Sequence, residues 1–187
     1  MLTRGGVFVR IRENKKYFVL FCMLGFLIGI LYANIVSKDY ITSMGIFNDF
    51  FLNQYAETDI GMAEYAWYII RIRMMPVILL FALGCTRIRK GVVVAFLLWT
   101  GFSCGMIMTS AIMKMGIKGI VLCLLAMTPQ FAFYIAGYVV LLWHLFSYPE
   151  SKWNLTKTVC FLLLLALGIV LECYVNPVLM KMFLKTL

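Results

Sequence analysis

The chain has 187 residues, of which 64% are hydrophobic and only 13% charged, and its formal net charge is +9. A soluble domain of this length carries about twice that share of charged residues, so the composition excludes an ordinary globular protein. Basic residues of membrane proteins gather at cytoplasmic loops and helix ends, and the positive charge therefore does not indicate nucleic-acid binding. We predict an all-α, multi-pass integral membrane helix bundle in which all 187 residues form one membrane domain.

The first predicted membrane helix covers residues 17–36 and follows a basic N-terminus. This stretch is long enough to cross a bilayer and no clear cleavage site follows it, so we expect it to stay in the protein and not to be a signal peptide. Gly25 and Gly29 lie one turn apart on the same face of this helix. Small residues at this spacing allow a second helix to approach closely.

The segment 37–66 is the longest polar region and holds five of the eight acidic residues. Five apolar residues recur there at helical spacing: Ile41, Met44, Phe47, Phe51 and Tyr55. This pattern predicts an amphipathic helix on the outer membrane surface. Its apolar face either lies in the membrane interface or is a docking surface for an extracytoplasmic partner.

Two further membrane helices are predicted over 67–85 and 91–113. The first of them has Arg71 and Arg73 near its start. The second contains another close-packing pair, Gly101 and Gly105. The two glycine faces can pack against each other within one chain or between chains, so a homo-oligomer stays open.

The distribution of charge predicts how the chain is oriented in the membrane. The N-terminus and the turn 86–90 are basic, and segment 37–66 is acidic. By the positive-inside rule, we expect the first two to be cytoplasmic and the acidic segment to be outside.

The segment 117–146 is too long for one straight membrane helix. It has no Asp, Glu, Lys or Arg from residue 119 onward, and Pro129 lies near its middle. A continuous helix of this length would span roughly 40 Å, against roughly 30 Å of hydrocarbon. Because proline removes a backbone donor and clashes with the preceding turn, we predict a break there. Gln130 either hydrogen-bonds the carbonyls freed by the break or lines a polar cavity.

The break leaves two topologies open. If 117–146 crosses once, the protein has five spans and its C-terminus is outside. If Pro129 turns the chain back, there are six segments and the C-terminus is inside. The two halves are short for full crossings, which favours one broken crossing, or a half-helix that dips into the membrane before the real span.

The last membrane helix is predicted over 158–175, ending at Asn176 and Pro177. Glu172 is the only acidic residue inside a predicted membrane helix, near its outer end. An unpaired carboxylate at such a position is costly, so we predict an ion pair with Arg71 or Arg73, at a comparable depth. The alternatives are a proton- or ion-coupling site, and a residue at the helix end whose side chain snorkels to the membrane surface.

The sequence contains no pattern of a catalytic or cofactor site. It has no phosphate-binding loop, no metal-ligand cluster and no nucleophile–base arrangement, and its polar loops are too short for a catalytic domain. The six cysteines lie in or beside apolar segments, unlike an extracellular disulfide framework. We expect a protein that is not an enzyme and that binds no cofactor or metal.

Several short motifs occur together in the order of a known family. They are Gly25–Asp39, Ile70–Gly84, Gly101–Gly105, Gly116–Gly119 followed by Pro129 and Gln130, and Glu172–Pro177. This ordered set resembles stage II sporulation protein M of endospore-forming Firmicutes, over nearly the whole chain.

The resemblance implies a multi-pass protein of the sporulation septum. Stage II sporulation proteins D and P, which degrade peptidoglycan, are its implied partners during septal thinning and engulfment of the forespore. It implies that the chain recruits and holds these partners and is not itself the hydrolase. Pro129, Gln130 and Glu172 match the family only as structural motif positions.

Two functional hypotheses follow. The first is a membrane scaffold that anchors cell-wall hydrolases. The second is a transporter or permease subunit built around the broken helix and Glu172. A permease requires a water-accessible cavity at the break, whereas a scaffold requires only a packed core.

Overall fold

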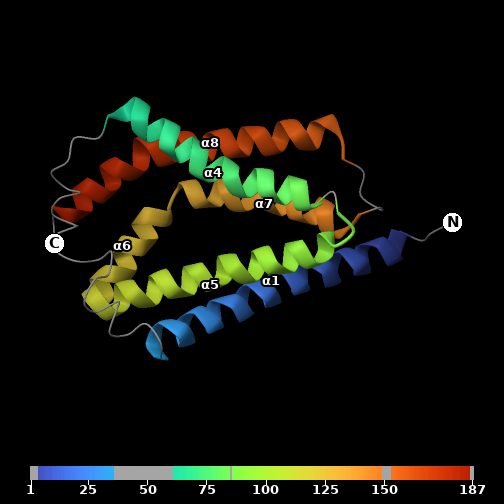
Figure 1. The fold of residues 1–187 in the computed structure, drawn as a ribbon, viewed down its shortest axis with the longest axis horizontal. Helices are drawn as coiled ribbons and strands as arrows, with labels where there is room; N and C mark the ends of the chain where they lie inside the picture. The colour runs from blue at the N-terminus through green and yellow to red at the C-terminus, as the bar shows by residue number, and fades with distance from the viewer. Residues whose placement is uncertain (1–3, 36–60, 85, 149–152, 186–187) are drawn as a thin grey trace.

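The protein is described by a computed structural model that covers residues 4–35, 61–84, 86–148 and 153–185, and all regular structure in these ranges is helical (Figure 1). The helices are α1 (Arg4–Ile35), α4 (Met62–Gly84), α5 (Arg89–Met115), α6 (Ile117–Met127), α7 (Gln130–Phe146) and α8 (Leu155–Leu184). The predicted all-α class is confirmed. The predicted amphipathic face of Ile41, Met44, Phe47, Phe51 and Tyr55 lies outside the described residues.

Four helices are long and apolar enough to cross a membrane: α1 from Lys16 onward, α4, α5 and α8. The pair α6–α7 passes the same test together and is bent by 60° at the break around Pro129. In Figure 1, α6 begins beside the end of α5 and α7 ends beside its start, so the pair leads the chain from one end of the bundle to the other. The described residues therefore contain four helices that can each cross a membrane, and a fifth crossing if the bent pair is counted as one broken span. α1 begins and α8 ends at opposite ends of the bundle.

The helices extend beyond their apolar stretches. α1 begins at Arg4 and α4 at Met62, because Arg, Lys, Glu, Met and Ala are good helix formers and continue a helix already formed. The predicted end of the last helix near Val175 is wrong, since α8 continues through Pro177 to Leu184. Proline removes one donor, but a bilayer offers no water to satisfy the backbone groups that an ended helix would expose, so helical bonding resumes after Pro177.

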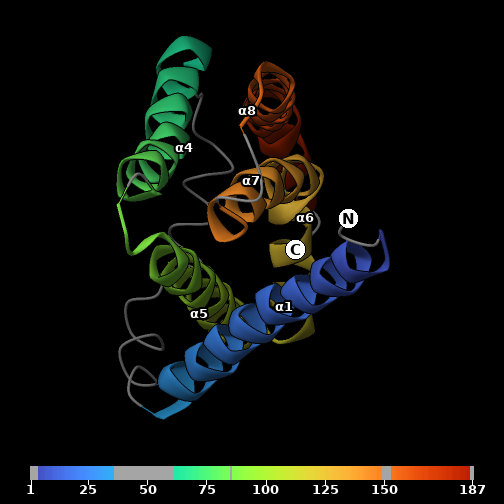
Figure 2. The same cartoon turned by 90° about the vertical axis from the view of Figure 1, so that its right-hand side faces the viewer.

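The two predicted glycine faces pack against each other within the chain. Gly25 and Gly29 of α1 lie against α5, and Gly101 and Gly105 of α5 lie against α1 (Figure 2). A Cβ atom added at any of the four would collide with backbone atoms of the facing helix. These glycines are therefore used inside one chain, and the side-by-side pair α1–α5 is held by close backbone contact.

The other helices form a second group beside this pair. Figure 2 shows α7 lying between α8 and the α1–α5 pair, with α4 at the outside. The main apolar core joins α4, α5, α7 and α8, and its members are Val77, Leu80, Val93, Leu141, Leu142, Leu145, Phe161 and Leu165. α4 buries only four residues of its 23, and it is therefore a peripheral helix with a wide exposed face.

Candidate functional site

The polar centre of the bundle is an ion pair between α4 and α8, in which the Glu172 side chain is buried and the Arg73 side chain is 29% exposed. Arg73 Nε donates a hydrogen bond of 2.8 Å to Glu172 Oε2, and Arg73 Nη2 bonds to Glu172 Oε1. Tyr134 of α7 donates its hydroxyl hydrogen to Glu172 Oε2 at 2.6 Å. Glu172 is only 6% exposed. The predicted pairing of Glu172 is confirmed, and its partner is Arg73.

The pair lies nearer the middle of its helices than the sequence suggested. Arg73 is eleven residues from either end of α4, which is about 16 Å along the helix axis. Glu172 is followed by twelve further residues of α8, about 18 Å. The prediction that Glu172 lies near the outer end of its helix is therefore wrong, because the chain beyond Pro177 stays helical.

Tyr134 is the third member of this site and was missed by sequence reasoning. Its ring lies under the Arg73 guanidinium, with 4.8 Å from Cζ to the ring centroid, while its hydroxyl binds Glu172. One side chain thus supports both charges of the pair. Tyrosine is common in membrane helices, so the residue type alone does not indicate a site. The one signal in the sequence was the position of Tyr134, one turn after Gln130 at the predicted break.

Gly168 makes room for the Tyr134 ring. A Cβ atom at Gly168 would lie 2.6 Å from Cε1 and 2.8 Å from Cδ1 of this ring, closer than atoms can approach. The ring packs against Gly168 of α8 and also contacts Arg73 of α4, so it has little freedom to move away.

We expect the Gly168→Ala substitution to displace Tyr134 and to lower the free energy of unfolding by about 1–3 kcal/mol, as overpacking does in other cores. Thermal unfolding in detergent measures the effect. Gly137→Ala on α7 is the matched control, because its Cβ would meet Leu164 and Phe161 at ordinary distances of 3.6 Å. Equal melting temperatures for both variants would contradict this packing role.

Gln130 repairs the helix break. It is 1% exposed, and its Nε2 donates to the carbonyl of Ala126 in α6. The last turn of α6 is also closed by Thr128, whose backbone and side chain both donate to Leu124 O. The hydrogen-bonding alternative for Gln130 is confirmed: this side chain bonds a carbonyl at the interruption.

Next to this region, two buried amide oxygens have no hydrogen-bond partner among the described residues. They are Gln130 Oε1 and Asn176 Oδ1. Gln130 lies one turn before Tyr134 on α7, and Asn176 lies one turn after Glu172 on α8. Since these helices run in opposite directions, both amides lie in the layer next to the Tyr134–Glu172 hydrogen bond, on its outer side under the predicted orientation.

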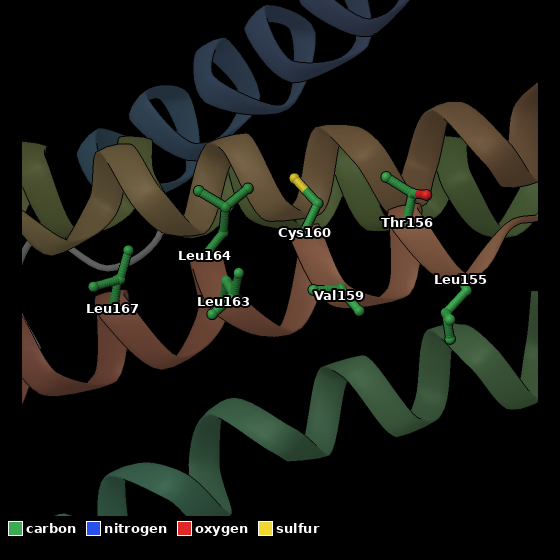
Figure 3. A pocket seen from close by; sticks show the side chains of 7 residues that line it. All are labelled: Leu155, Thr156, Val159, Cys160, Leu163, Leu164 and Leu167. Carbon is green, nitrogen blue, oxygen red and sulfur yellow. The ribbon is translucent and has the colours of Figure 1, made fainter.

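A groove of about 550 Å³ runs along the other half of α8, away from the polar site. Its lining consists of seven residues of α8 between Leu155 and Leu167, which Figure 3 shows along one face of the helix. The lining is almost entirely apolar and does not include Glu172 or Gln130. In a membrane protein such a face suits lipid chains.

Comparison with known proteins identifies no family for this chain. No family model, no curated protein and no solved structure matches the chain. Within the described ranges, no group of three or more His, Cys, Asp or Glu side chains is placed to hold a metal ion.

The remaining predicted residues are not part of this site. Pro129 lies at the break. Gly25, Gly29, Gly101 and Gly105 form the separate α1–α5 contact. Arg71, the other predicted partner of Glu172, is exposed on α4.

Proposed function

We propose that this protein is a non-catalytic membrane scaffold of the sporulation septum. It recruits and anchors peptidoglycan-degrading partners for septal thinning and forespore engulfment, with its N-terminus in the cytoplasm. The process, the septal location and the partners, stage II sporulation proteins D and P, come from the family resemblance of the ordered motifs.

One observation favours a scaffold over a permease: Glu172 and Gln130 are both buried and hydrogen-bonded within the protein. Glu172 is 6% exposed, and both of its oxygens accept hydrogen bonds. Gln130 is 1% exposed and bonds the backbone at the break. A permease would need these side chains to face water, whereas a scaffold needs a rigid bundle that presents its surfaces in a constant arrangement.

A second candidate function is a permease subunit. It is favoured by the unpartnered oxygens of Gln130 and Asn176, which lie beside a broken helix in the middle of the chain. Polar groups at such a break are a common place for substrates of membrane transporters.

Photo-crosslinking from the outer segment tests the scaffold. A photoreactive residue is placed in turn at Ile41, Met44, Phe47, Phe51 and Tyr55, in cells that co-express tagged proteins D and P. We expect capture of one or both partners from at least one of these positions and none from Leu163, an exposed control on α8.

Two other results would change the conclusion. Crosslinks from the C-terminal tail alone would move the docking surface to that end. The absence of any crosslink, together with solute flux in proteoliposomes that Glu172→Gln abolishes, would replace the scaffold by the permease.

A further inference from the structure

The two arginines of α4 point in opposite directions. They are two residues apart, which rotates one side chain by about 200° from the other around the helix axis. Arg73 faces the bundle and binds Glu172. Arg71 is exposed and lies opposite the buried residues Ile69 and Leu80. In the part of the chain that the structure describes, Arg71 has no ion pair, hydrogen bond or ring contact.

Arg71 lies in a largely apolar stripe, with Tyr68 and Glu64 as its polar neighbours toward the start of the helix. Trp67, Met75 and Ile78 share its side of α4 at helical spacing, and they are 70%, 68% and 60% exposed. We call these four residues the outer face of α4. Arg71 follows Met62 by nine residues, or about 14 Å of helix. A cation at this depth requires a counter-charge, because hydrocarbon solvates it poorly.

The same helix shows how the protein satisfies such a cation. Arg73, about 3 Å further along the axis, is met by a carboxylate from a neighbouring helix that binds it through two nitrogens. The outer face presents a similar cation that has no ionic partner among the described residues. Tryptophan, methionine and arginine are also the residues that protein interfaces prefer.

A second copy of the chain does not fit this face. Two copies in one membrane are related by a twofold axis along the membrane normal, which would place Arg71 opposite Arg71 at the same depth. Like charges in a poorly solvated interface repel strongly. The occupant therefore has to bring a negative charge of its own.

We infer that the outer face of α4 is the docking surface for a membrane-spanning helix of another protein, which carries a carboxylate at the depth of Arg71. This inference rests on the proposed scaffold function and names the surface through which the scaffold holds a partner inside the membrane. Trp67, Met75 and Ile78 supply the apolar contact, and Arg71 sets the depth and selects the acidic partner.

A synthetic helix tests this directly. The probe is a membrane-spanning Leu–Ala peptide with a single Glu at the depth of Arg71, and its association with the purified full chain is measured by energy transfer in phosphatidylcholine vesicles. We expect the Glu peptide to bind about tenfold more tightly than the same peptide with Leu at that position. Arg71→Leu should remove this preference, and a peptide with Glu seven residues deeper should not show it.

Leu163→Ala on the exposed face of α8 is the control variant and should leave the preference unchanged. The melting temperature of Arg71→Leu should equal that of the wild type, because the Arg73–Glu172 pair stays intact. Equal binding of Glu and Leu peptides would overturn the inference.

The competing occupant is a lipid phosphate reached by the long arginine side chain. Brominated phosphatidylglycerol that quenches tryptophan fluorescence of the wild type but not of Arg71→Leu, without any Glu-peptide preference, would assign Arg71 to lipid and overturn the inference. If the peptide preference is absent while proteins D and P still crosslink to the outer segment, only this docking surface is wrong. If both are absent, the scaffold fails as well.

Discussion

Replacing Glu172 by glutamine will lower the free energy of unfolding by up to about 3 kcal/mol, because it leaves the partly buried Arg73 cation without its counter-charge. Glutamine has nearly the same shape, so the loss comes from charge and not from a cavity. The amide also replaces a carboxylate that accepts from both Arg73 and Tyr134. Thermal and denaturant unfolding of the purified protein in detergent measures the change.

The double variant Arg73→Met/Glu172→Gln separates charge from packing. With both charges gone, no cation is left unpaired, and we expect most of the lost stability to return. Arg71→Gln is the matched control on the same helix and should stay within about 0.5 kcal/mol of the wild type, because its exposed side chain has no partner in the described chain. A Glu172→Gln protein as stable as the wild type would show that the pair is not what holds α4 to α8.

Substitution of Gly101 by alanine will lower the free energy of unfolding by about 1–3 kcal/mol and loosen the α1–α5 pair. The added Cβ would collide with the backbone of Cys22, and backbone cannot give way as a flexible side chain can. The two helices must therefore separate, which weakens contacts along their whole length. The melting temperature and the rate of crosslinking between cysteines placed on α1 and α5 report the change.

Gly91→Ala is the control for helix propensity. Gly91 is on the same helix, and a Cβ atom there would meet nothing within 4 Å. Alanine is the better helix former, so this variant should be equal to the wild type or more stable by up to about 1 kcal/mol. A similar response of Gly91 and Gly101 would mean that close approach of the helices is not the role of the glycines at positions 101 and 105.

The elements that depend on local chemistry could be predicted. The membrane helices follow from runs of apolar residues, and the bounds of α6 and α7 follow from Pro129. The need for a partner at Glu172 follows from the cost of a lone carboxylate in hydrocarbon. Each of these conclusions requires only the residues themselves and the solvent around them.

Other features depend on contacts between distant segments. Arg71 and Arg73 are chemically identical, and only the rotation of α4 against α8 selects the second as the partner of Glu172. Tyr134 became part of the site because α7 lies beside α8. The end of α8 was misjudged because proline ends helices in water, where freed backbone groups are hydrated, but not necessarily in a bilayer.

By itself the sequence determined a multi-pass helical membrane protein with a break at Pro129, the need for a partner at its intramembrane acid and two glycine faces for close packing. Hydropathy, proline geometry and the cost of burying charge act within one helix and need no neighbours. Tertiary structure alone decided that the glycine faces meet each other, that Arg73 and Tyr134 close the site around Glu172, and that Arg71 is left facing outward. These outcomes depend on how helices rotate and pack, which is set by the shape of the whole bundle.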